Sequence, residues 1–120
     1  MGCERGTPSD ETIRLAEKAL QAAGIAVAQL RLLTSIDNRA QEPAILAVGK
    51  HFAIELVVFD AEALEKETPR LANPSEVVFA RVGCHGVAEA AALAAAGPQA
   101  KLVLPKIKSG TATAAIAEIF

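Results

Sequence analysis

Two short segments that combine glycine, cysteine and charged residues hold the side chains best suited to chemistry. One is VGCHGVAEAAALAAAG, residues 82–97, in which His85 and Glu89 lie four positions apart among small apolar residues. The imidazole of His85, with an ordinary pKa near 6.5, could act as a general acid or base or as a donor to a ligand. Glu89 would fall in the first turn of the following helix, where negative charge is favoured for structural reasons alone. Function and structure therefore stay open for His85, and a structural role is favoured for Glu89.

The other segment is GCERGTP, residues 2–8, which sets two glycines and Arg5 just ahead of an expected helix. Exposed backbone N–H groups and the positive end of a helix dipole attract anions, and glycine lets a ligand approach closely. The segment lacks the third glycine of a dinucleotide fingerprint and the GK[ST] of a Walker loop. It predicts either a small-anion cradle or a plain tight turn.

The two cysteines do not indicate a metal site. Cys3, Cys84 and His85 show none of the CxxC or HxxxH spacings that metal ligands usually have. A nucleophilic thiol needs a base within hydrogen-bond reach, and adjacent residues such as Cys84 and His85 often point apart. We expect free thiols, no metal and no cofactor.

Helices and strands alternate along the chain. Thr7 as N-cap and Pro8 as the first helical residue predict a helix that ends at Gly24. Asp60 can cap a short helix, and Asn73 can begin another with Glu76 completing a capping-box-like pattern. The predicted helices span residues 8–23, 43–51, 60–66, 74–81 and 87–96, and the predicted strands include residues 30–33 and 54–59, with a polar loop over 34–39.

The tail KLVLPKIKSGTATAAIAEIF alternates like a β-hairpin around Ser109-Gly110. A two-residue turn would set Lys108 opposite Thr111 and Lys106 opposite Thr113, all on one face. That face is either a solvated sheet edge or a basic, hydroxyl-lined surface. Together these elements predict an α/β fold: a three-layer α/β/α domain with a mixed β-sheet and a C-terminal β-hairpin. Because GCERGTP looks like a strand-to-helix loop with only Met1 ahead of it, we expect the N-terminal strand to be missing or shortened.

Composition narrows the function classes. The 120 residues are 52% hydrophobic and 22% charged, which fits one globular domain over residues 1–120. With four Phe, no Trp or Tyr, and a net charge of -2, the chain offers neither stacking platforms nor a basic surface. We expect no nucleic-acid partner, no membrane association and a cytoplasmic location.

The whole chain resembles the CobE/CbiG C-terminal domain family of cobalamin (vitamin B12) biosynthesis. The resemblance rests on four segments in family order: GCERGTPSDETI, SIDNRAQE, VGCHGVAEAAAL and LPKIKSGTATAAIA. Arg39 stands where the family usually has lysine, which keeps the charge but changes the geometry. A hydrophobic strand that usually precedes the GC motif is not present.

The resemblance implies a role in building the corrin ring. The longer CbiG proteins open the ring-A lactone of a cobalt-precorrin and release acetaldehyde, and this chain corresponds to their C-terminal part, like the stand-alone CobE form. We expect an accessory or carrier protein that binds a polycarboxylated corrinoid or precorrin intermediate. The alternatives are a CbiG-type lactone hydrolase and a generic small-anion or nucleotide-binding module. Contacts with other cobalamin-pathway enzymes and a homo-oligomer are left open.

A ligand with many carboxylates needs local cations and backbone donors, because the protein itself is slightly acidic. In open α/β sheets ligands lie outside the carboxyl ends of strands, where the GC loop, the 35–42 loop and Lys106 are expected to meet. The predicted catalytic residues are His85 and Glu89. The predicted ligand-binding residues are Gly2, Cys3, Arg5, Thr7, Ser35, Asp37, Arg39, Glu42, Gly83, His85, Lys106, Lys108 and Ser109.

Overall fold

The computed structural model describes residues 1–119, which form five strands and five α-helices. The strands are β1 (Gly2–Cys3), β2 (Leu32–Ile36), β3 (Glu55–Phe59), β4 (Lys101–Lys108) and β5 (Ala112–Glu118). The helices are α1 (Ser9–Ala23), α2 (Pro43–Phe52), α3 (Ala61–Glu65), α4 (Glu76–Val82) and α5 (Ala88–Ala96). Short 3₁₀ turns cover Val27–Gln29, Asp37–Arg39 and Thr68–Arg70.

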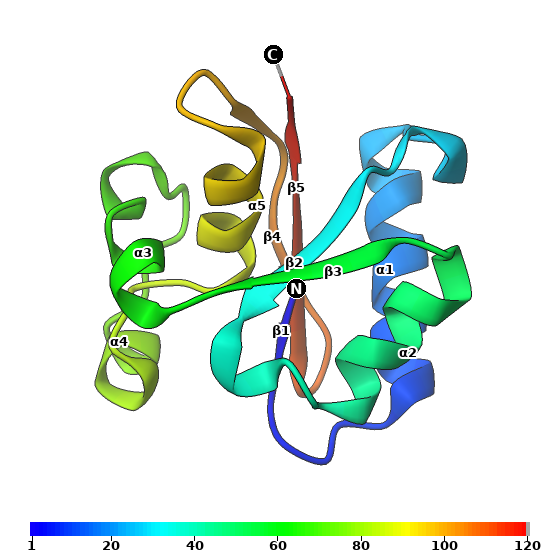
Figure 1. The fold of residues 1–120 in the computed structure, drawn as a ribbon, viewed down its shortest axis with the longest axis horizontal. Coiled ribbons are helices and arrows are strands. Elements are labelled where there is room, and N and C mark those ends of the chain that lie inside the picture. The colour runs from blue at the N-terminus through cyan, green and yellow to red at the C-terminus, as the bar shows by residue number, and fades with distance from the viewer. Residues whose placement is uncertain (120) are drawn as a thin grey trace.

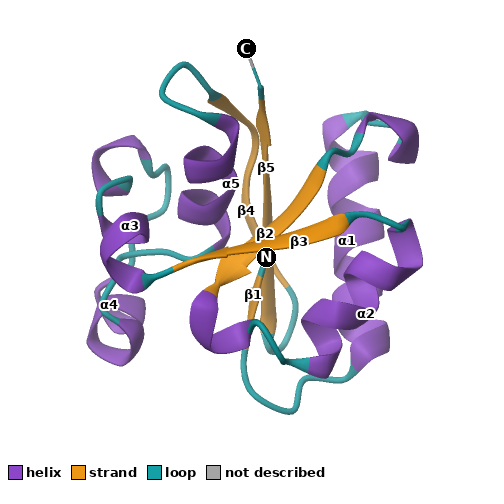
Figure 2. Cartoon of the chain, in the orientation of Figure 1, coloured by secondary structure: helices purple, strands orange, loops and turns teal. Residues whose placement is uncertain are grey.

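The elements stack in three layers, with helices α1 and α2 on one side of the strands and α3, α4 and α5 on the other (Figures 1 and 2). The strands make two hydrogen-bonded sheets, an antiparallel one in the order β1-β5-β4 and a parallel pair β2-β3. Met1 links them, because its amine donates to the Thr34 carbonyl at 2.7 Å while its own carbonyl accepts from Ser35 Oγ at 2.7 Å. The predicted α/β fold, with both strand directions and a C-terminal strand pair, is confirmed.

Each helical layer has its own apolar cluster. On the α1 side, Leu15, Ala19, Leu33, Ile45 and Val48 are buried together. On the other side the buried cluster is Ile36, Leu64, Cys84, Ala90 and Ala91. The small side chains of α5 let that helix pack closely against the strands, as its apolar sequence predicts.

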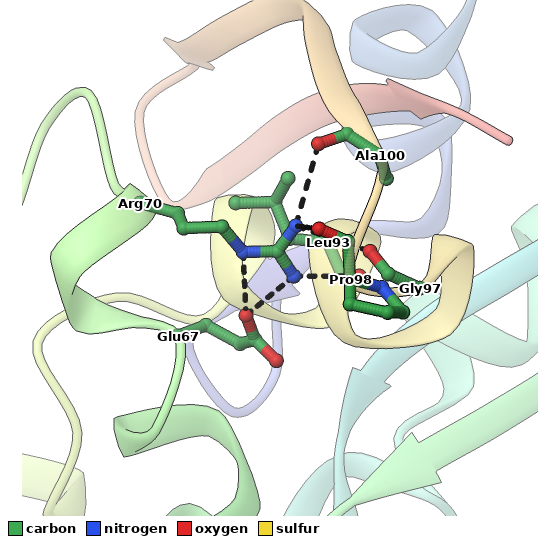
Figure 3. A network of polar contacts seen from close by, with 6 residues as sticks. All are labelled: Glu67, Arg70, Leu93, Gly97, Pro98 and Ala100. Carbon is green, nitrogen blue, oxygen red and sulfur yellow. Dashed lines mark hydrogen bonds and ion pairs between the residues drawn. The ribbon is translucent and has the colours of Figure 1, made fainter. Parts of the chain in front are cut away.

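Arg70 fixes the end of α5 (Figure 3). Its Nη1 donates to the carbonyls of Gly97 at 3.0 Å and Ala100 at 3.3 Å, and its Nη2 donates to the Leu93 carbonyl at 3.2 Å. The Glu67 carboxylate accepts from Arg70 Nε at 2.9 Å. A guanidinium therefore binds three backbone carbonyls at and just beyond the C-terminal end of α5, where the helix dipole favours positive charge.

Four of the predicted helices begin one or two residues too early, and the N-caps of α1 and α4 differ from the predicted ones. Pro8 is extended (φ −60°, ψ 135°) and stands at the N-cap of α1, and the Thr7 hydroxyl donates to the Glu4 carbonyl instead of capping. The cap of α4 is Ser75, whose Oγ accepts from the Val78 N–H at 3.3 Å. Asn73 does not cap because it bonds to Glu89 in α5, a tertiary contact that local sequence does not reveal.

The hairpin register also differs from the prediction. The Ser109 N–H donates to the Ala112 carbonyl, so the two-residue turn is Gly110-Thr111 rather than Ser109-Gly110, and Lys108 lies opposite Thr113 rather than Thr111. Lys106 falls where the register shifts between Leu104 and Ile107 and so does not face Thr113. The reason is tertiary: the Glu11 carboxylate of α1 accepts hydrogen bonds from the N–H of Thr111, at 2.7 Å, and from the Ser109 hydroxyl, which draws Thr111 into the turn.

Candidate functional site

The carboxyl ends of β2 and β3 lie at the same edge, since the two strands are parallel and Ile36 pairs with Phe59. Three loops gather there. Residues 37–42 follow β2 directly, residues 83–86 pack on it through the contact of buried Cys84 with the Ile36 cluster, and residues 3–7 are tied in by Arg39. We call these three loops the strand-end site. This is the edge at which open α/β sheets bind ligands.

Arg39 joins the loop after β2 to the GC loop. Its Nε donates to the Cys3 carbonyl at 2.7 Å, and its Nη1 donates to the Asn38 carbonyl at 3.3 Å. The guanidinium is half-buried, with one edge used to hold the backbone. Arg5 is exposed on the same loop. The structure thus brings Cys3, Arg5 and Arg39 together, as the sequence predicts.

The GC loop is a tight turn that already holds a carboxylate. The Gly6 N–H donates to Glu42 Oε2 at 3.3 Å, and Glu42 is buried. Gly6 has φ of +77°, a conformation that glycine adopts without strain. The Thr7 N–H returns to the Glu4 carbonyl at 3.3 Å. The loop is therefore a tight turn, and the same turn offers an N–H group to an anion. In this structure the anion is the Glu42 carboxylate of the protein itself.

His85 lies under α4 with a carboxylate on each side. Its Nδ1 is 2.9 Å from both carboxylate oxygens of Glu65, and its Nε2 is 3.4 Å from Glu76 Oε1. Its ring stacks on Phe79 at a centroid distance of 4.3 Å, and the side chain is only 17% exposed. The hydrogen bond from Glu65 raises the pKa of His85, and the same bond lowers the pKa of Glu65.

Glu65 is the residue that sequence reasoning missed. It stands at the end of α3, and it also accepts the His85 backbone N–H at 3.0 Å, so it positions both the ring and the loop. Nothing within a few residues marks it, because its partner is twenty positions away. One feature of the sequence could have indicated Glu65. The short helix capped by Asp60 directly follows β3, so its last turn must lie near the strand-end site.

Glu89 is buried, 2% exposed, and its carboxylate is fully engaged. Oε1 accepts from the Asn73 N–H at 2.9 Å, and Oε2 accepts from Asn73 Nδ2 and from the Lys106 N–H, each at 2.9 Å. Burial alone would raise the pKa of Glu89, but these hydrogen bonds outweigh it and the pKa is lowered. Glu89 ties the 73 loop and β4 to the start of α5, in keeping with the structural role that its position favours.

The turn of the β4–β5 hairpin lies beside α1 and not at the strand-end site. Lys108 and Ser109 lie beside the first turns of α1, where they line a shallow hollow with Pro8, Glu11 and Arg14. Lys106 is held by its backbone to Glu89. Thr7 connects the two regions, because its hydroxyl donates to Thr111 Oγ1 at 3.0 Å. The structure therefore places Lys108 and Ser109 on the far side of the GC loop from His85.

The remaining predicted residues lie in or next to the backbone segments that form the strand-end site. Ser35 is fully buried and bonded to Met1, and Asp37 is exposed at the start of the 3₁₀ turn after β2. Gly2 lies in β1, where an added Cβ would come within 3.3 Å of Val87. Gly83 ends α4 with φ of +85°. Ser35 and Gly2 act through the backbone they hold, whereas the side chain of Asp37 is exposed at this edge.

Burial raises the pKa of both the Cys3 and the Cys84 thiols. Within residues 1–119, no group of three or more His, Cys, Asp and Glu side chains is arranged to hold a metal ion. In the same residues no helix has the length and apolar character needed to cross a membrane. What the strand-end site offers is guanidinium groups, backbone amides and one histidine paired with a carboxylate.

Comparisons with known proteins give matches over nearly the whole chain. Residues 1–117 match the family model described as Cobalamin synthesis G C-terminus. The chain is 59% identical over 117 residues to Protein CobE of Sinorhizobium sp, covering 98% of this chain and 76% of that protein. It is 32% identical over 119 residues to cobalt-precorrin-5A hydrolase of Priestia megaterium, covering 99% of this chain but only 31% of that longer protein.

Two solved structures have a similar fold. The crystal structure of CobE, a protein from the cobalamin (vitamin B12) biosynthetic pathway, superposes with a TM-score of 0.91 at 33% identity and covers 99% of this chain and 87% of that one. The cobalamin biosynthesis protein chiG from Agrobacterium tumefaciens gives a TM-score of 0.73 at 32% identity, over 98% of this chain and 94% of that one.

Proposed function

This chain belongs to the cobalamin synthesis G C-terminal family, and from that premise we propose that it binds a polycarboxylated corrinoid or precorrin intermediate as an accessory or carrier protein of cobalamin biosynthesis. The observation that carries the proposal is the junction of Arg39 with the GC loop at the carboxyl edge of β2 and β3. We further propose that residues 1–120 act as one domain in this role.

The chemistry of the site suits carboxylates. Guanidinium groups recognise them through charge-assisted and bidentate hydrogen bonds, and the N–H groups of turns donate hydrogen bonds to them at close range. The Gly6 amide already bonds to the Glu42 carboxylate, which is direct support for the loop as a carboxylate receptor. Arg5 and Arg39 provide the positive charge that the acidic chain otherwise lacks at this edge.

The apolar body of a corrin ring needs a different surface, and α4 offers one. Val77 is 64% exposed and Phe79 is 42% exposed, on the helix that covers His85. Large exposed apolar side chains next to a charged site are typical of a surface that receives a ligand or partner. In the proposed complex the ring lies against α4 while its carboxylates reach the GC loop and Arg39.

Titration of the purified protein with a precorrin or a hydrogenobyrinic-type compound, followed by absorbance and by product mass, tests this proposal. Binding without a change of mass is expected. Arg5→Ala together with Arg39→Ala should weaken binding at least about tenfold and flatten its salt dependence, because fewer ionic contacts remain to be screened. Arg31→Ala, which removes an exposed arginine at the opposite end of β2, is the matched control and should bind normally. Unchanged affinity in the double variant contradicts the strand-end site.

A second candidate function is a hydrolase of the CbiG type, and the Glu65–His85 pair favours it. A carboxylate that holds an imidazole can orient it as a general base for water attacking a lactone carbonyl, with Arg39 stabilising the oxyanion. The 32% identity to a cobalt-precorrin-5A hydrolase supports the same class. Loss of a two-carbon unit from the ligand, abolished by His85→Ala but retained in Arg31→Ala, would establish the enzyme and exclude the carrier role.

A further inference from the structure

Helix α4 lies on the molecular surface and buries none of its seven side chains. Val77 is 64% exposed and Phe79 is 42% exposed, while the half-buried Val82 packs against the buried cluster of Ile36 and Cys84. Figure 1 shows α4 at the outer edge of the molecule. A helix of this length is not stable in water on its own, so its structure depends on contacts that other elements make with it.

Both ends of α4 are anchored by residues outside the helix. Before it, Asn73 bonds through its N–H and its side chain to the buried Glu89. After it, Gly83 takes the left-handed conformation, with φ of +85°, and the buried Cys84 follows. We call residues 74–83, between these anchors, the α4 flap. A segment with fixed ends and an unburied helix can open without disturbing the strands or α5.

His85 lies beneath the flap and contacts it in three ways. Its carbonyl accepts from the Ser75 N–H at 2.7 Å. Its ring stacks on Phe79 at a centroid distance of 4.3 Å, and its Nε2 lies 3.4 Å from Glu76 Oε1. The ring is itself fixed to α3, because its Nδ1 lies 2.9 Å from both carboxylate oxygens of Glu65. His85 therefore connects the flap to the body of the molecule.

The charged groups that face the His85 ring are two carboxylates, Glu65 of α3 and Glu76 of α4. Arg81 of α4 points to the GC loop instead. The neighbouring thiol of Cys84 lies in the apolar cluster, and burial raises its pKa, so it adds no charge. The balance of charge under the flap thus depends on the ring and these two carboxylates.

The protonation state of the ring decides the sign of its contact with Glu76. A charged imidazolium has a hydrogen on each nitrogen, so it donates to Glu65 through Nδ1 and to Glu76 through Nε2. A neutral ring has one hydrogen, and Glu65 retains it because that contact is shorter and involves both carboxylate oxygens. The Nε2 lone pair then faces the Glu76 carboxylate, and attraction becomes repulsion.

We propose that the α4 flap is a pH-dependent cover of His85 at the strand-end site, closed while this ring is protonated and released when it loses its proton. The hydrogen bond with Glu65 raises the pKa of His85, so release occurs above the ordinary value of 6.5, as the pH rises through the raised pKa. One consequence rests on the proposed function: release uncovers a side chain that is 17% exposed under the closed flap. A neutral imidazole is also the form that accepts a proton, so opening of the flap and competence as a base coincide.

Amide exchange measured by NMR in the absence of a corrinoid tests the flap, with each rate divided by the intrinsic rate at the same pH. The reporters are the N–H groups of Phe79 and Gly83, which donate to the Ser75 and Phe79 carbonyls. The N–H of Ala91, hydrogen-bonded in α5, reports on the rest of the fold. Between about pH 6 and about pH 8.5 the protection of the reporters should fall at least about fivefold, in step with the His85 ring resonances, while that of Ala91 stays constant.

Two carboxylate variants separate the flap from a merely structural helix. In Glu76→Gln the carboxamide can accept from the charged ring or donate to the neutral one, so the fall in protection should disappear. Glu62→Gln is the matched control, because it removes another exposed carboxylate from the first turn of a helix, and it should keep the fall. Glu65→Gln should lower the midpoint of the His85 titration and the midpoint of flap release together, which decides the matter if Glu76→Gln leaves α4 unprotected throughout.

Several results overturn the proposal. They are reporters whose protection is constant or absent at both pH values, an equal loss at Ala91, a fall that persists in Glu76→Gln, and a midpoint that does not follow His85 in Glu65→Gln. A ring that stays charged to about pH 8.5 also overturns it, since the flap is then never released in that range. Corrinoid binding is not a readout, so failure here leaves the proposed function untouched.

Discussion

Replacing Glu89 with glutamine isolates the contribution of one buried carboxylate to the fold. Its Oε2 accepts two N–H donors, from Asn73 Nδ2 and the Lys106 backbone, and its Oε1 accepts one, from the Asn73 backbone. A carboxamide of the same shape keeps both Oε2 bonds if its oxygen takes that position. Its NH2 group then faces the Asn73 N–H, so one hydrogen bond is lost and two donors oppose each other.

The magnitude follows from these three bonds. A hydrogen bond to a charged group contributes about 1.5–3 kcal/mol, and the two that remain become bonds to a neutral oxygen. Part of the loss at Asn73 is recovered by water, because that residue is exposed. We expect Glu89→Gln to lower the free energy of unfolding by about 2–3 kcal/mol, and Glu89→Ala, which removes all three bonds and leaves a cavity, by about 3–5 kcal/mol.

The pH dependence gives an independent signature. The pKa of Glu89 is lowered in the folded state, so its contribution is fully present above the ordinary value of 4.5 and is lost as pH falls through the lowered pKa. The difference between the wild-type chain and Glu89→Gln should therefore be constant from pH 5 to 8 and shrink below about 4.5.

Urea unfolding measured across this pH range tests the prediction, with Glu55→Gln at an exposed strand end as the matched control. The control should stay within about 0.5 kcal/mol of the wild-type chain, as surface substitutions usually do. If Glu89→Gln is equally close to the wild-type value at pH 7, the carboxylate does not tie the 73 loop and β4 to α5.

Three further changes have defined outcomes. Because the His85–Glu65 bond raises one pKa and lowers the other, the pair stabilises the fold most between the ordinary values of 4.5 and 6.5. It loses that contribution as pH rises through the raised pKa of His85 or falls through the lowered pKa of Glu65. An NMR titration of Glu65→Gln should return the His85 midpoint toward 6.5, and an unmoved midpoint argues against the pairing. Arg70→Lys should lower the free energy of unfolding by about 2 kcal/mol in urea, since an ammonium group cannot reach the same carbonyls as a planar guanidinium; wild-type stability would contradict this. Gly83→Ala should cost about 1 kcal/mol in the same assay because φ is +85°, and no cost would mean that the turn relaxes.

The order and type of the elements were predictable from sequence because each carries a local signal. Pro43 and the apolar residues of 43–52 specify α2, and the side chain of Asp60 caps α3 as its position predicts. The predictions that were wrong concern helix caps and the hairpin register, which depend on hydrogen bonds to residues far away in the sequence. Asn73 looks like a cap but bonds to Glu89, and the hairpin turn shifts by one residue, to Gly110-Thr111, because Glu11 holds Thr111.

The same division applies to the site. Arg39 and the GC loop were predictable as neighbours, since a loop that follows a strand end must lie at that edge. The pairing of His85 with Glu65 was not, because no periodicity connects a loop residue with a residue at the end of a separate helix. Lys108 and Ser109 were placed with the site on the strength of a hairpin register that the α1 contact changes.

Several donors in or beside the strand-end site are already bonded to the protein's own carboxylates. Gly6 bonds to Glu42, His85 bonds to Glu65, and Arg81 lies 3.6 Å from Glu4. These internal partners hold the loops in shape without a ligand, so little conformational entropy is lost when one binds. They also make binding an exchange, in which a carboxylate of the ligand must displace one of the protein's own. A ligand with a single carboxylate gains little from such an exchange. One with many carboxylates on a rigid ring gains more with each contact after the first, because the later contacts are intramolecular. In the proposed binding role, this exchange favours a polycarboxylated macrocycle over small monocarboxylates.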